Sequence, residues 1–482
     1  MKKFIKILSL CLAALIFSMS FVACADDGDE TPTGSSDTGN SENESDTDLA
    51  PSVDKNNYDA EFSIMGMGDI FREEYFYAEE NNYNEMTEAV YLRQENVKDY
   101  LGVEIIYTNA TDFQTYATEF KTSVSTGSEQ YHLCLTHANV GVWDLISSNA
   151  LYDYNNLPGI NLDADYWNKE MMEEAAYKDQ MFLGYSDYAL ASTYIIAFNK
   201  TIYETEVAEN IESSLYDMVN NYEWTLDQMI SISSMVSEDL DGNGVYDEKD
   251  KYGMVGLMWV PMCGFLQASN MNVMERDNSG NYVLTINNEK TIDLIEKLDA
   301  FVDADYTYLY FHTVPEDQRV DFKDGTALFE LRDTYTFIDL KESGIKFGVL
   351  PYPMYDTAQK DVGYRHLSWN GWMAVAADIS DPDMVGDTLE MLSYYSAPVT
   401  TAFYENLLGA KVSDAPEDAE ILDLVWGSLV TDLGMVYSTL DMGIDAMLYA
   451  IPRCINENAA FTRYYAQNGT KAQKVIDRQL NS

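Results

Sequence analysis

Short strand-like segments alternate with amphipathic helical segments along most of this chain, and that alternation limits the fold more than any other feature. Residues 61–66 and 103–108 have the character of strands, and residues 87–102 between them have helical periodicity and end at a glycine. A helical segment at 112–127 and a strand-like segment at 131–137 continue the pattern. Strands separated by helices of this length form βαβ units, so we predict an α/β fold with a mainly parallel sheet.

The same pattern extends into the second half of the chain. Amphipathic helices are expected at residues 291–305, 383–396 and 418–430. No short-period repeat is present, which argues against a solenoid or a propeller.

The first 24 residues have the order of features found in a bacterial secretion signal. Three lysines form a basic start, an apolar run follows, and small residues lead into Cys24. The charges in and after this run argue against a membrane-spanning helix. The step into Cys24 resembles the bacterial lipobox, which implies that residues 1–23 are removed and that Cys24 carries a lipid. Ordinary secretion, with cleavage nearby, is the alternative.

Residues 24–53 are acidic, rich in Ser, Thr and Gly, and nearly free of large apolar side chains. They contain nine Asp and Glu and no basic residue. Because such a segment buries too little surface to fold, we predict a disordered tether that holds a folded body away from the membrane. The formal charge of −52 for the whole chain excludes nucleic acid as a partner and favours solubility outside the cell.

Residue types that support catalysis or crosslinking are scarce or badly spaced. Outside the signal, only Cys134, Cys263 and Cys454 remain, and an odd number of widely spaced cysteines predicts buried free thiols. The four histidines lack metal-ligand spacing. Zinc-protease, nucleophile-elbow and phosphate-loop motifs are absent from the sequence. We therefore do not expect an enzyme.

Residues 239–250, DLDGNGVYDEKD, follow the register of a calcium-binding loop. Oxygen-bearing side chains occupy positions one, three, five, nine and twelve, with glycine at six and a backbone carbonyl at seven. The twelfth residue is Asp, where EF-hands have Glu. We predict a structural Ca²⁺ site, with an Asx-rich turn as the alternative. The expected ligands are Asp239, Asp241, Asn243, Val245, Asp247 and Asp250.

This loop precedes the strand that leads to Trp259. We therefore expect the ion to hold the approach to the loop that carries Trp259, and to take no part in catalysis or signalling.

Seven segments spread along the chain after the tether carry a resemblance to a known family. They are residues 90–105, 131–154, 161–170, 192–200, 222–254, 322–335 and 347–356. Their number and order, together with the lipobox, resemble the extracellular solute-binding proteins of ABC transporters. Within that family they are most similar to the large sugar-binding group that includes maltose-binding protein.

The resemblance implies a two-lobed, periplasmic-binding-protein-like type II fold of the α/β class. The ligand would bind in the cleft between the lobes, where the carboxyl ends of strands converge. It places residues 54–188 and 363–398 in the first lobe, and residues 189–362 and 399–482 in the second.

A sugar site needs flat aromatic platforms and planar hydrogen-bonding groups. By the resemblance, the first-lobe loops supply Asp69, His137 and Asn139, although an N-cap role for Asp69 and a structural turn role for His137 are equal alternatives. Of Trp369 and Trp372, one is expected to stack on the ligand and the other to pack. The remaining expected contacts are Asp187, Tyr188, Trp259, Arg332 and Tyr335.

These expectations define a lipid-anchored extracellular monomer that captures a solute, expected to be an oligosaccharide, and delivers it to a membrane permease. Two other functions stay open on the sequence. One is a secreted glycoside hydrolase, which would need a pair of carboxyl groups. The other is a binding protein for a non-sugar solute such as a peptide.

Overall fold

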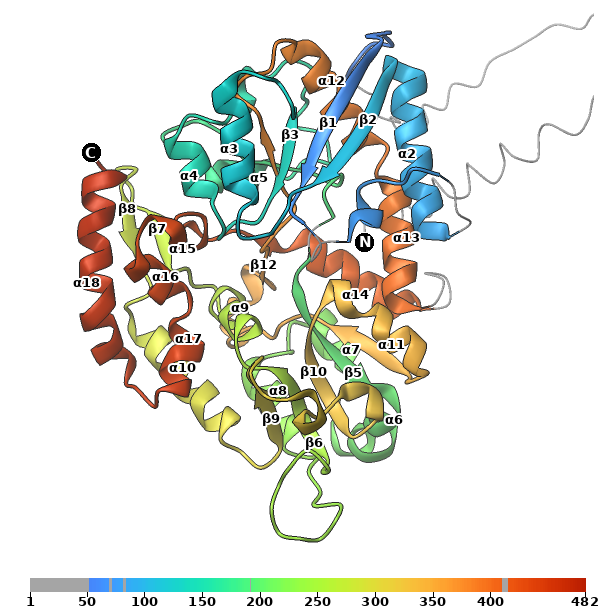
Figure 1. Ribbon diagram of the computed structural model, residues 1–482. Helices are drawn as coiled ribbons and strands as arrows, with labels where there is room; N and C mark the ends of the chain where they lie inside the picture. Colours follow the sequence, from blue (N-terminus) through green and yellow to red (C-terminus); the bar gives the residue numbers. More distant parts are fainter. Residues whose placement is uncertain (1–51, 69–71, 81–83, 191, 410–414) are drawn as a thin grey trace, which may run out of the picture.

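The computed structural model describes residues 52–482, except residues 69–71, 81–83, 191 and 410–414. Two five-stranded sheets, each flanked by helices, form two lobes (Figure 1). The predicted signal, lipid site Cys24, most of the predicted tether, and Asp69 lie outside the described residues.

The first sheet has the strand order β2-β1-β3-β13-β4. Strand β1 pairs in parallel with β2 and β3, and β13 runs antiparallel to β3 and β4. The bounds are Ala60–Gly66 for β1, Val103–Asn109 for β2, Leu133–Thr136 for β3, Gly184–Tyr185 for β4 and Trp372–Val375 for β13.

Local sequence accounts for the connection between β1 and β2. The Asn84 side chain accepts a hydrogen bond from the Met86 N–H and starts α2, Glu85–Leu101. Gly102 ends the helix in the left-handed conformation, at φ 66°, and donates its N–H to the Lys98 carbonyl. The predicted helix and its two flanking strands are therefore confirmed.

The second sheet has the order β11-β5-β10-β6-β9. Strands β6, β9 and β10 are parallel, whereas β5 runs antiparallel to β10 and β11. The bounds are Tyr194–Asn199 for β5, Tyr252–Leu257 for β6, Thr307–Tyr310 for β9, Ala327–Asp333 for β10 and Phe347–Leu350 for β11.

The remaining strands form two short two-stranded sheets. A hairpin pairs β7, Met274–Arg276, with β8, Tyr282–Leu284. Strand β12, His366–Leu367, pairs in parallel with β14, Leu429–Val430, and lies between the two lobes (Figure 1).

Helices cover both sheets. Those before β12 are α3 Tyr116–Thr126, α4 Val142–Ser147, α5 Lys169–Ala175, α6 Lys200–Ile202, α7 Leu215–Asn220, α8 Leu226–Ser233, α9 Val260–Ala268, α10 Glu289–Val302 and α11 Ile338–Ser343. Those after β13 are α12 Pro382–Tyr394, α13 Ala397–Leu408, α14 Pro416–Gly427, α15 Leu433–Val436, α16 Met442–Leu448, α17 Ala450–Asn456 and α18 Phe461–Gln479. The three helices predicted in the second half correspond to α10, α12 and α14.

Two of the expected domain boundaries fall within folded segments of the structure. Ser52 and Val53, placed at the end of the predicted tether, already belong to the folded body. The Ser52 hydroxyl donates to Glu390 at 2.8 Å, and Val53 is buried. The predicted division after residue 398 falls inside α13, which packs against α2 and also against α11.

The three cysteines predicted as free thiols are buried and unbonded. Desolvation raises the pKa of Cys454 to about 12. The prediction of buried thiols is confirmed for these residues.

Candidate ligand-binding cleft

Four aromatic rings from distant segments meet between the lobes. His137 follows the carboxyl end of β3, and its ring centroid lies 6.0 Å from that of Trp369, which precedes β13. Trp259 follows the carboxyl end of β6, and its ring stacks on Tyr449 with centroids 5.1 Å apart. Tyr449 also lies 6.3 Å from Trp369. We call His137, Trp259, Trp369 and Tyr449 the ring cluster.

Polar groups surround these rings. The Asn139 amide donates to the Tyr449 hydroxyl at 2.9 Å. The Arg453 guanidinium lies 5.5 Å from the Trp259 ring centroid and 5.9 Å from that of Tyr449, a cation–π arrangement. Arg453 also pairs with Asp445 at 3.2 Å. A platform of rings is thus bordered by an amide, a phenol and a guanidinium.

The histidine of the ring cluster, His137, is uncharged at neutral pH. Burial lowers the pKa of His137 to about 4, and a hydrogen bond with Asn139 acts in the opposite direction. Desolvation also raises the pKa of Tyr449 above its usual value, so its hydroxyl stays protonated. At neutral pH His137, Asn139 and Tyr449 therefore offer uncharged donors and acceptors beside flat apolar rings, and Arg453 adds a charged donor. Such a combination suits the hydroxyls and C–H faces of a sugar.

Four residues that the resemblance nominated meet here: His137, Asn139, Trp259 and Trp369. Tyr449 and Arg453 were not predicted. They lie in the helical carboxyl-terminal region, and no local motif marks them. The only sequence signal is their spacing. Tyr449 and Arg453 are about one helical turn apart near the start of α17, Ala450–Asn456.

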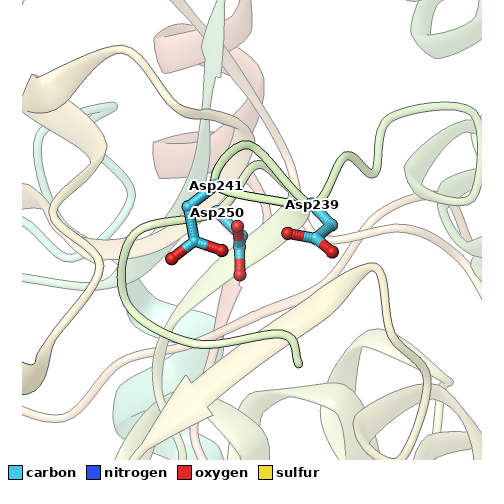
Figure 2. A group of neighbouring side chains, drawn as sticks. All are labelled: Asp239, Asp241 and Asp250. Carbon is cyan, nitrogen blue, oxygen red and sulfur yellow. The ribbon is translucent and has the colours of Figure 1, made fainter. Parts of the chain in front are cut away.

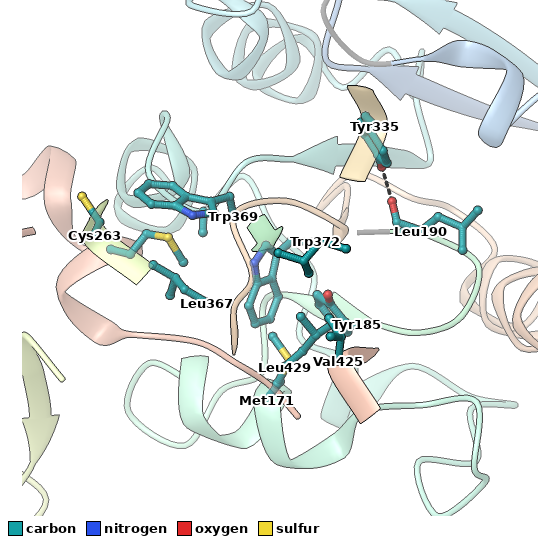
Figure 3. Close-up of a cluster of buried hydrophobic side chains, with 14 of the residues drawn as sticks. Met171, Tyr185, Leu190, Cys263, Tyr335, Leu367, Trp369, Trp372, Val425 and Leu429 are labelled. Atoms are coloured by element: carbon teal, nitrogen blue, oxygen red, sulfur yellow. Dashed lines mark hydrogen bonds between the residues drawn. The ribbon is translucent and has the colours of Figure 1, made fainter. Parts of the chain in front are cut away.

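Arg332 and Tyr335, which were expected to contact the ligand, instead bind other residues of the protein. Arg332 pairs with Glu330 at 2.9 Å and donates to the Thr336 carbonyl at 2.7 Å, and its side chain is only 11% exposed. The hydroxyl of Tyr335 donates to the Leu190 carbonyl (Figure 3), and its ring packs on Tyr75. Neither joins the ring cluster.

Tyr188 and Trp372 are fully buried and present no surface to a solute in this structure. The Tyr188 ring lies under the Arg93 guanidinium at 4.5 Å. Trp372 packs edge-on against Tyr185 with centroids 4.9 Å apart (Figure 3). Trp372 lies in the strand, which directs its side chain into the core. Trp369 is also buried, at 4% exposure, and differs in that it contacts His137 and Tyr449.

Asp187 lines a different cavity, of about 200 Å³. Its neighbours there include Tyr185, Tyr404 and Trp426, and none of the ring cluster lines it. Asp187 is thus separate from the residues that meet between the lobes.

Three carboxylates of the acidic loop lie close together (Figure 2). One oxygen of each of Asp239, Asp241 and Asp250 falls within 4.8 Å of the others. The Gly244 N–H donates to Asp239 at 2.7 Å and is the main cause that lowers the pKa of this carboxyl. The buried Asp250 accepts from the Leu240 N–H at 2.9 Å.

The other expected ligands follow the same turn. The Asn243 side chain accepts from the Val245 N–H at 2.6 Å, and Asp247 accepts from the Lys249 N–H at 3.0 Å. These bonds turn the loop back on itself and leave oxygen lone pairs for a cation.

The place of this loop corrects one expectation. It precedes the amino end of β6, whereas Trp259 follows the carboxyl end. Six residues of strand separate the two by about 20 Å, and the loop extends from the far end of the second lobe (Figure 1). An ion there is too far away to hold the loop that carries Trp259.

Within the described ranges, no helix combines the length and apolar character needed to cross a membrane.

No protein-family model matches this sequence, and no curated protein sequence matches it. Solved structures do match its fold. The GacH receptor of Streptomyces glaucescens, studied unliganded and with acarbose, has a TM-score of 0.57 at 14% identity, over 87% of this chain and 98% of its own. The MalE domain of Bdellovibrio bacteriovorus, bound to maltotriose, has a TM-score of 0.55 at 12% identity, over 88% and 100%.

A third structure extends the comparison. The ABC substrate-binding protein Lmo0181 of Listeria monocytogenes, in complex with cycloalternan, has a TM-score of 0.52 at 13% identity, covering 85% of this chain and 99% of its own. At such identities the likeness establishes the fold. The chain therefore has the two-lobed α/β fold of the maltose-binding-protein-like substrate-binding proteins of ABC transporters.

Proposed function

We propose that this protein captures a carbohydrate between its lobes and delivers it to an ABC importer. The observation that carries the proposal is the ring cluster, because it joins His137 and Trp369 at the first sheet with Trp259 at the second. Structures of the same fold hold acarbose, maltotriose and cycloalternan, which supports a sugar as the solute.

The capture step follows from residues on both sides of the cleft. A sugar ring seated on Trp259 or Trp369 would receive hydrogen bonds from Asn139 and Arg453. Contacts to both lobes form only when the lobes are close together. The ligand therefore binds the closed state more tightly than the open state, and this difference in affinity shifts the protein toward the closed state.

Delivery requires that the protein stay near its permease. The proposal places a lipid on Cys24 at the outer face of the cell membrane, followed by the acidic segment as a tether. An intact-mass measurement of protein from the native membrane tests this step. A mature chain that starts at Cys24 with a diacylglycerol group is expected, and Cys24→Ser should release the protein into the medium. An unmodified amino terminus elsewhere would contradict lipid anchoring.

The binding step is tested by calorimetry of the purified protein against mono- and oligosaccharides. At least one sugar should bind without turnover. Trp259→Ala and Trp369→Ala should each weaken it about tenfold or more, because each removes a stacking platform. Tyr222→Ala is a matched control, since Tyr222 stacks on Tyr364 within another part of the chain. Release of shorter sugars would indicate a hydrolase, and binding of peptides alone would indicate a different solute.

We propose in addition that the acidic loop binds a structural Ca²⁺. The three close carboxylates fit a hard cation that prefers oxygen ligands, and their mutual repulsion would be relieved by it. Asp239, Asp241, Asn243 and Asp250 would supply side-chain oxygens and Val245 its carbonyl. Asp247 would contribute at the ninth position. The ion would stabilise the far end of the second lobe.

A further inference from the structure

The hairpin of β7 and β8 is fixed to the second lobe. Helix α18 packs against β8 (Figure 1), and it also packs against α10, which contacts β9 of the second sheet. The Asn481 side chain accepts a hydrogen bond from the Tyr282 N–H at 2.7 Å and donates to the Tyr282 carbonyl at 3.0 Å. Because its backbone is held in this way, the hairpin moves with the second lobe.

One side chain of this hairpin, Arg276, binds the end of a helix in the first lobe. Its guanidinium donates to the carbonyl oxygens of Glu173 at 2.5 Å, Glu174 at 2.9 Å and Ala176 at 3.4 Å. These carbonyls lie at the carboxyl end of α5, which packs against β4 of the first sheet. The Tyr282 hydroxyl donates to the same Ala176 carbonyl at 3.2 Å. All four hydrogen bonds therefore join one lobe to the other.

The carboxyl end of α5 gains both donors and charge from this contact. The last four carbonyls of a helix have no partner within the helix, and a positive charge near them is favourable. Helix α5 has no basic residue in its last turn, which instead carries Glu173 and Glu174. Arg276 supplies the positive charge and three of the hydrogen bonds. Because Arg276 belongs to the other lobe, this stabilisation exists only while the lobes are together.

Aromatic rings enclose the contact. Tyr282 is only 3% exposed, and its ring packs edge-on against Tyr437 with centroids 5.3 Å apart. Tyr437 in turn packs against Trp143 and Tyr177 of the first lobe, with centroids 5.6 and 6.3 Å apart. Hydrogen bonds from a charged donor are strengthened where water is partly excluded. Charge-assisted bonds and ring packing thus act at the same place, and both come from the chain's own residues.

We infer that Arg276 clasps the two lobes together independently of any solute. We call Arg276, Tyr282 and the carboxyl end of α5 the interlobe clasp. Its hydrogen bonds involve no residue of the ring cluster. The clasp shifts the equilibrium of the free protein toward the arrangement with the lobes together. Its consequence for capture rests on the proposed function: a solute that binds this arrangement gains apparent affinity in proportion to the fraction of protein that already has it.

The test measures the distance between the lobes in protein without sugar. Spin labels on Asp144→Cys in α4 and Lys474→Cys in α18, both at exposed positions, report this distance by double electron–electron resonance. The protein is the chain from residue 24 with Cys24→Ser, because the three cysteines that the structure describes are buried and should not react. A short distance should be present. Arg276→Met should lower the ratio of short to long distances about tenfold or more, because charge-assisted bonds are lost.

Two milder substitutions grade the effect. Arg276→Lys keeps the charge but lacks the planar fork that serves several carbonyls, so the ratio should fall only about threefold. Tyr282→Phe keeps the packed ring and removes one neutral hydrogen bond, so the ratio should fall about twofold to threefold. This variant also tests the clasp if Arg276→Met does not fold, which far-UV circular dichroism shows.

Arg319→Met is the matched control. Arg319 also donates to two backbone carbonyls, those of Val314 at 2.8 Å and His312 at 2.9 Å, but all three residues belong to the second lobe. The variant loses similar hydrogen bonds without any contact to the first lobe. It should therefore leave the ratio of short to long distances unchanged.

Three results would overturn the inference: only long distances in the sugar-free protein, a distribution that Arg276→Met and Tyr282→Phe both leave unchanged, or an equal shift in Arg319→Met. The last would mean that loss of any such hydrogen bonds loosens the protein. These measurements use no sugar, so they stand apart from the calorimetric test of the proposed function. Failure to bind any sugar would contradict capture by the cleft and would leave the clasp unaffected.

Discussion

The indole of Trp259 lies flat against the phenol ring of Tyr449, with planes 12° from parallel. Trp259 follows a strand of the second sheet, whereas Tyr449 joins two helices near the carboxyl terminus. The hydroxyl of Tyr449 is held by Asn139, which follows a strand of the first sheet. This pair therefore connects three segments that only folding brings together.

Two substitutions at Tyr449 should separate stacking from hydrogen bonding. Tyr449→Phe keeps the ring and removes the acceptor for Asn139, so sugar affinity should fall only about threefold to tenfold. Tyr449→Ala also removes the ring that supports Trp259, and the loss should exceed about tenfold. Calorimetry with the best sugar measures both. Equal affinity in all three proteins would place the sugar elsewhere.

Calcium should raise the melting temperature of the protein. A ligand at about a hundred times its Kd stabilises the native state by about 2.7 kcal/mol, so scanning calorimetry in calcium and in chelator should differ by several degrees. Asp241→Ala should abolish the difference. Asp277→Ala is the matched control, because Asp277 also caps a turn, accepting from Ser279 and Asn281. Identical melting curves in calcium and in chelator would contradict calcium binding and mean that the loop is only an Asx-rich turn.

Removal of the Glu390 carboxylate should destabilise the first lobe. Glu390 is fully buried and accepts hydrogen bonds from Ser52, the Asn161 N–H, Tyr166 and the Trp167 indole. Glu390→Ala leaves these donors unsatisfied and should lower the free energy of unfolding by about 2–4 kcal/mol. Glu390→Gln keeps one acceptor oxygen and should have an intermediate effect. Urea unfolding measures both, and no change in either variant would refute the role of this carboxylate.

Stability should depend on pH through His366. Burial lowers its pKa to about 3, against about 6.5 in an unfolded chain. Between these values the unfolded chain binds a proton that the native protein does not. The free energy of unfolding therefore falls as pH drops below about 6.5, by up to about 1.4 kcal/mol per pH unit.

The measurement compares urea unfolding of His366→Asn and the unsubstituted protein between pH 6.5 and 4. The variant should lose less stability per pH unit. Asp432, whose pKa burial raises to about 6, acts in the opposite direction below pH 6 but is present in both proteins and cancels in the comparison. His312→Asn, at an exposed position, should leave the pH dependence unchanged. Parallel curves for His366→Asn would contradict the prediction.

Local rules were sufficient for β1, α2 and β2 of the first sheet. The Asn84 cap, the helical periodicity that follows it and Gly102 act over a few residues, and the structure has the helix and strands where these signals place them. The acidic loop is a similar case. Hydrogen bonds between neighbouring residues such as Asp239 and Gly244 determine its turn. They do not determine its distance from Trp259.

Whether a site residue could be predicted depends on how far along the sequence its neighbours in the structure lie. His137 and Trp259 could be nominated because each directly follows a strand whose carboxyl end faces the cleft in folds of this kind. Trp369 and Trp372 are three residues apart, and the sequence alone could not separate them. Both are buried in the structure, Trp372 completely and Trp369 at 4% exposure, and Trp369 alone lies beside His137.

The sequence by itself determined the α/β class, the alternation of strands and helices in residues 61–137, and the turn at residues 239–250, because these depend on contacts between near neighbours. The tertiary structure alone decided that Tyr449 and Arg453 complete the ring cluster and that Arg276 binds the carboxyl end of α5. Those groupings depend on how two sheets and the carboxyl-terminal helices pack. Packing brings together residues hundreds of positions apart, and no local pattern records it.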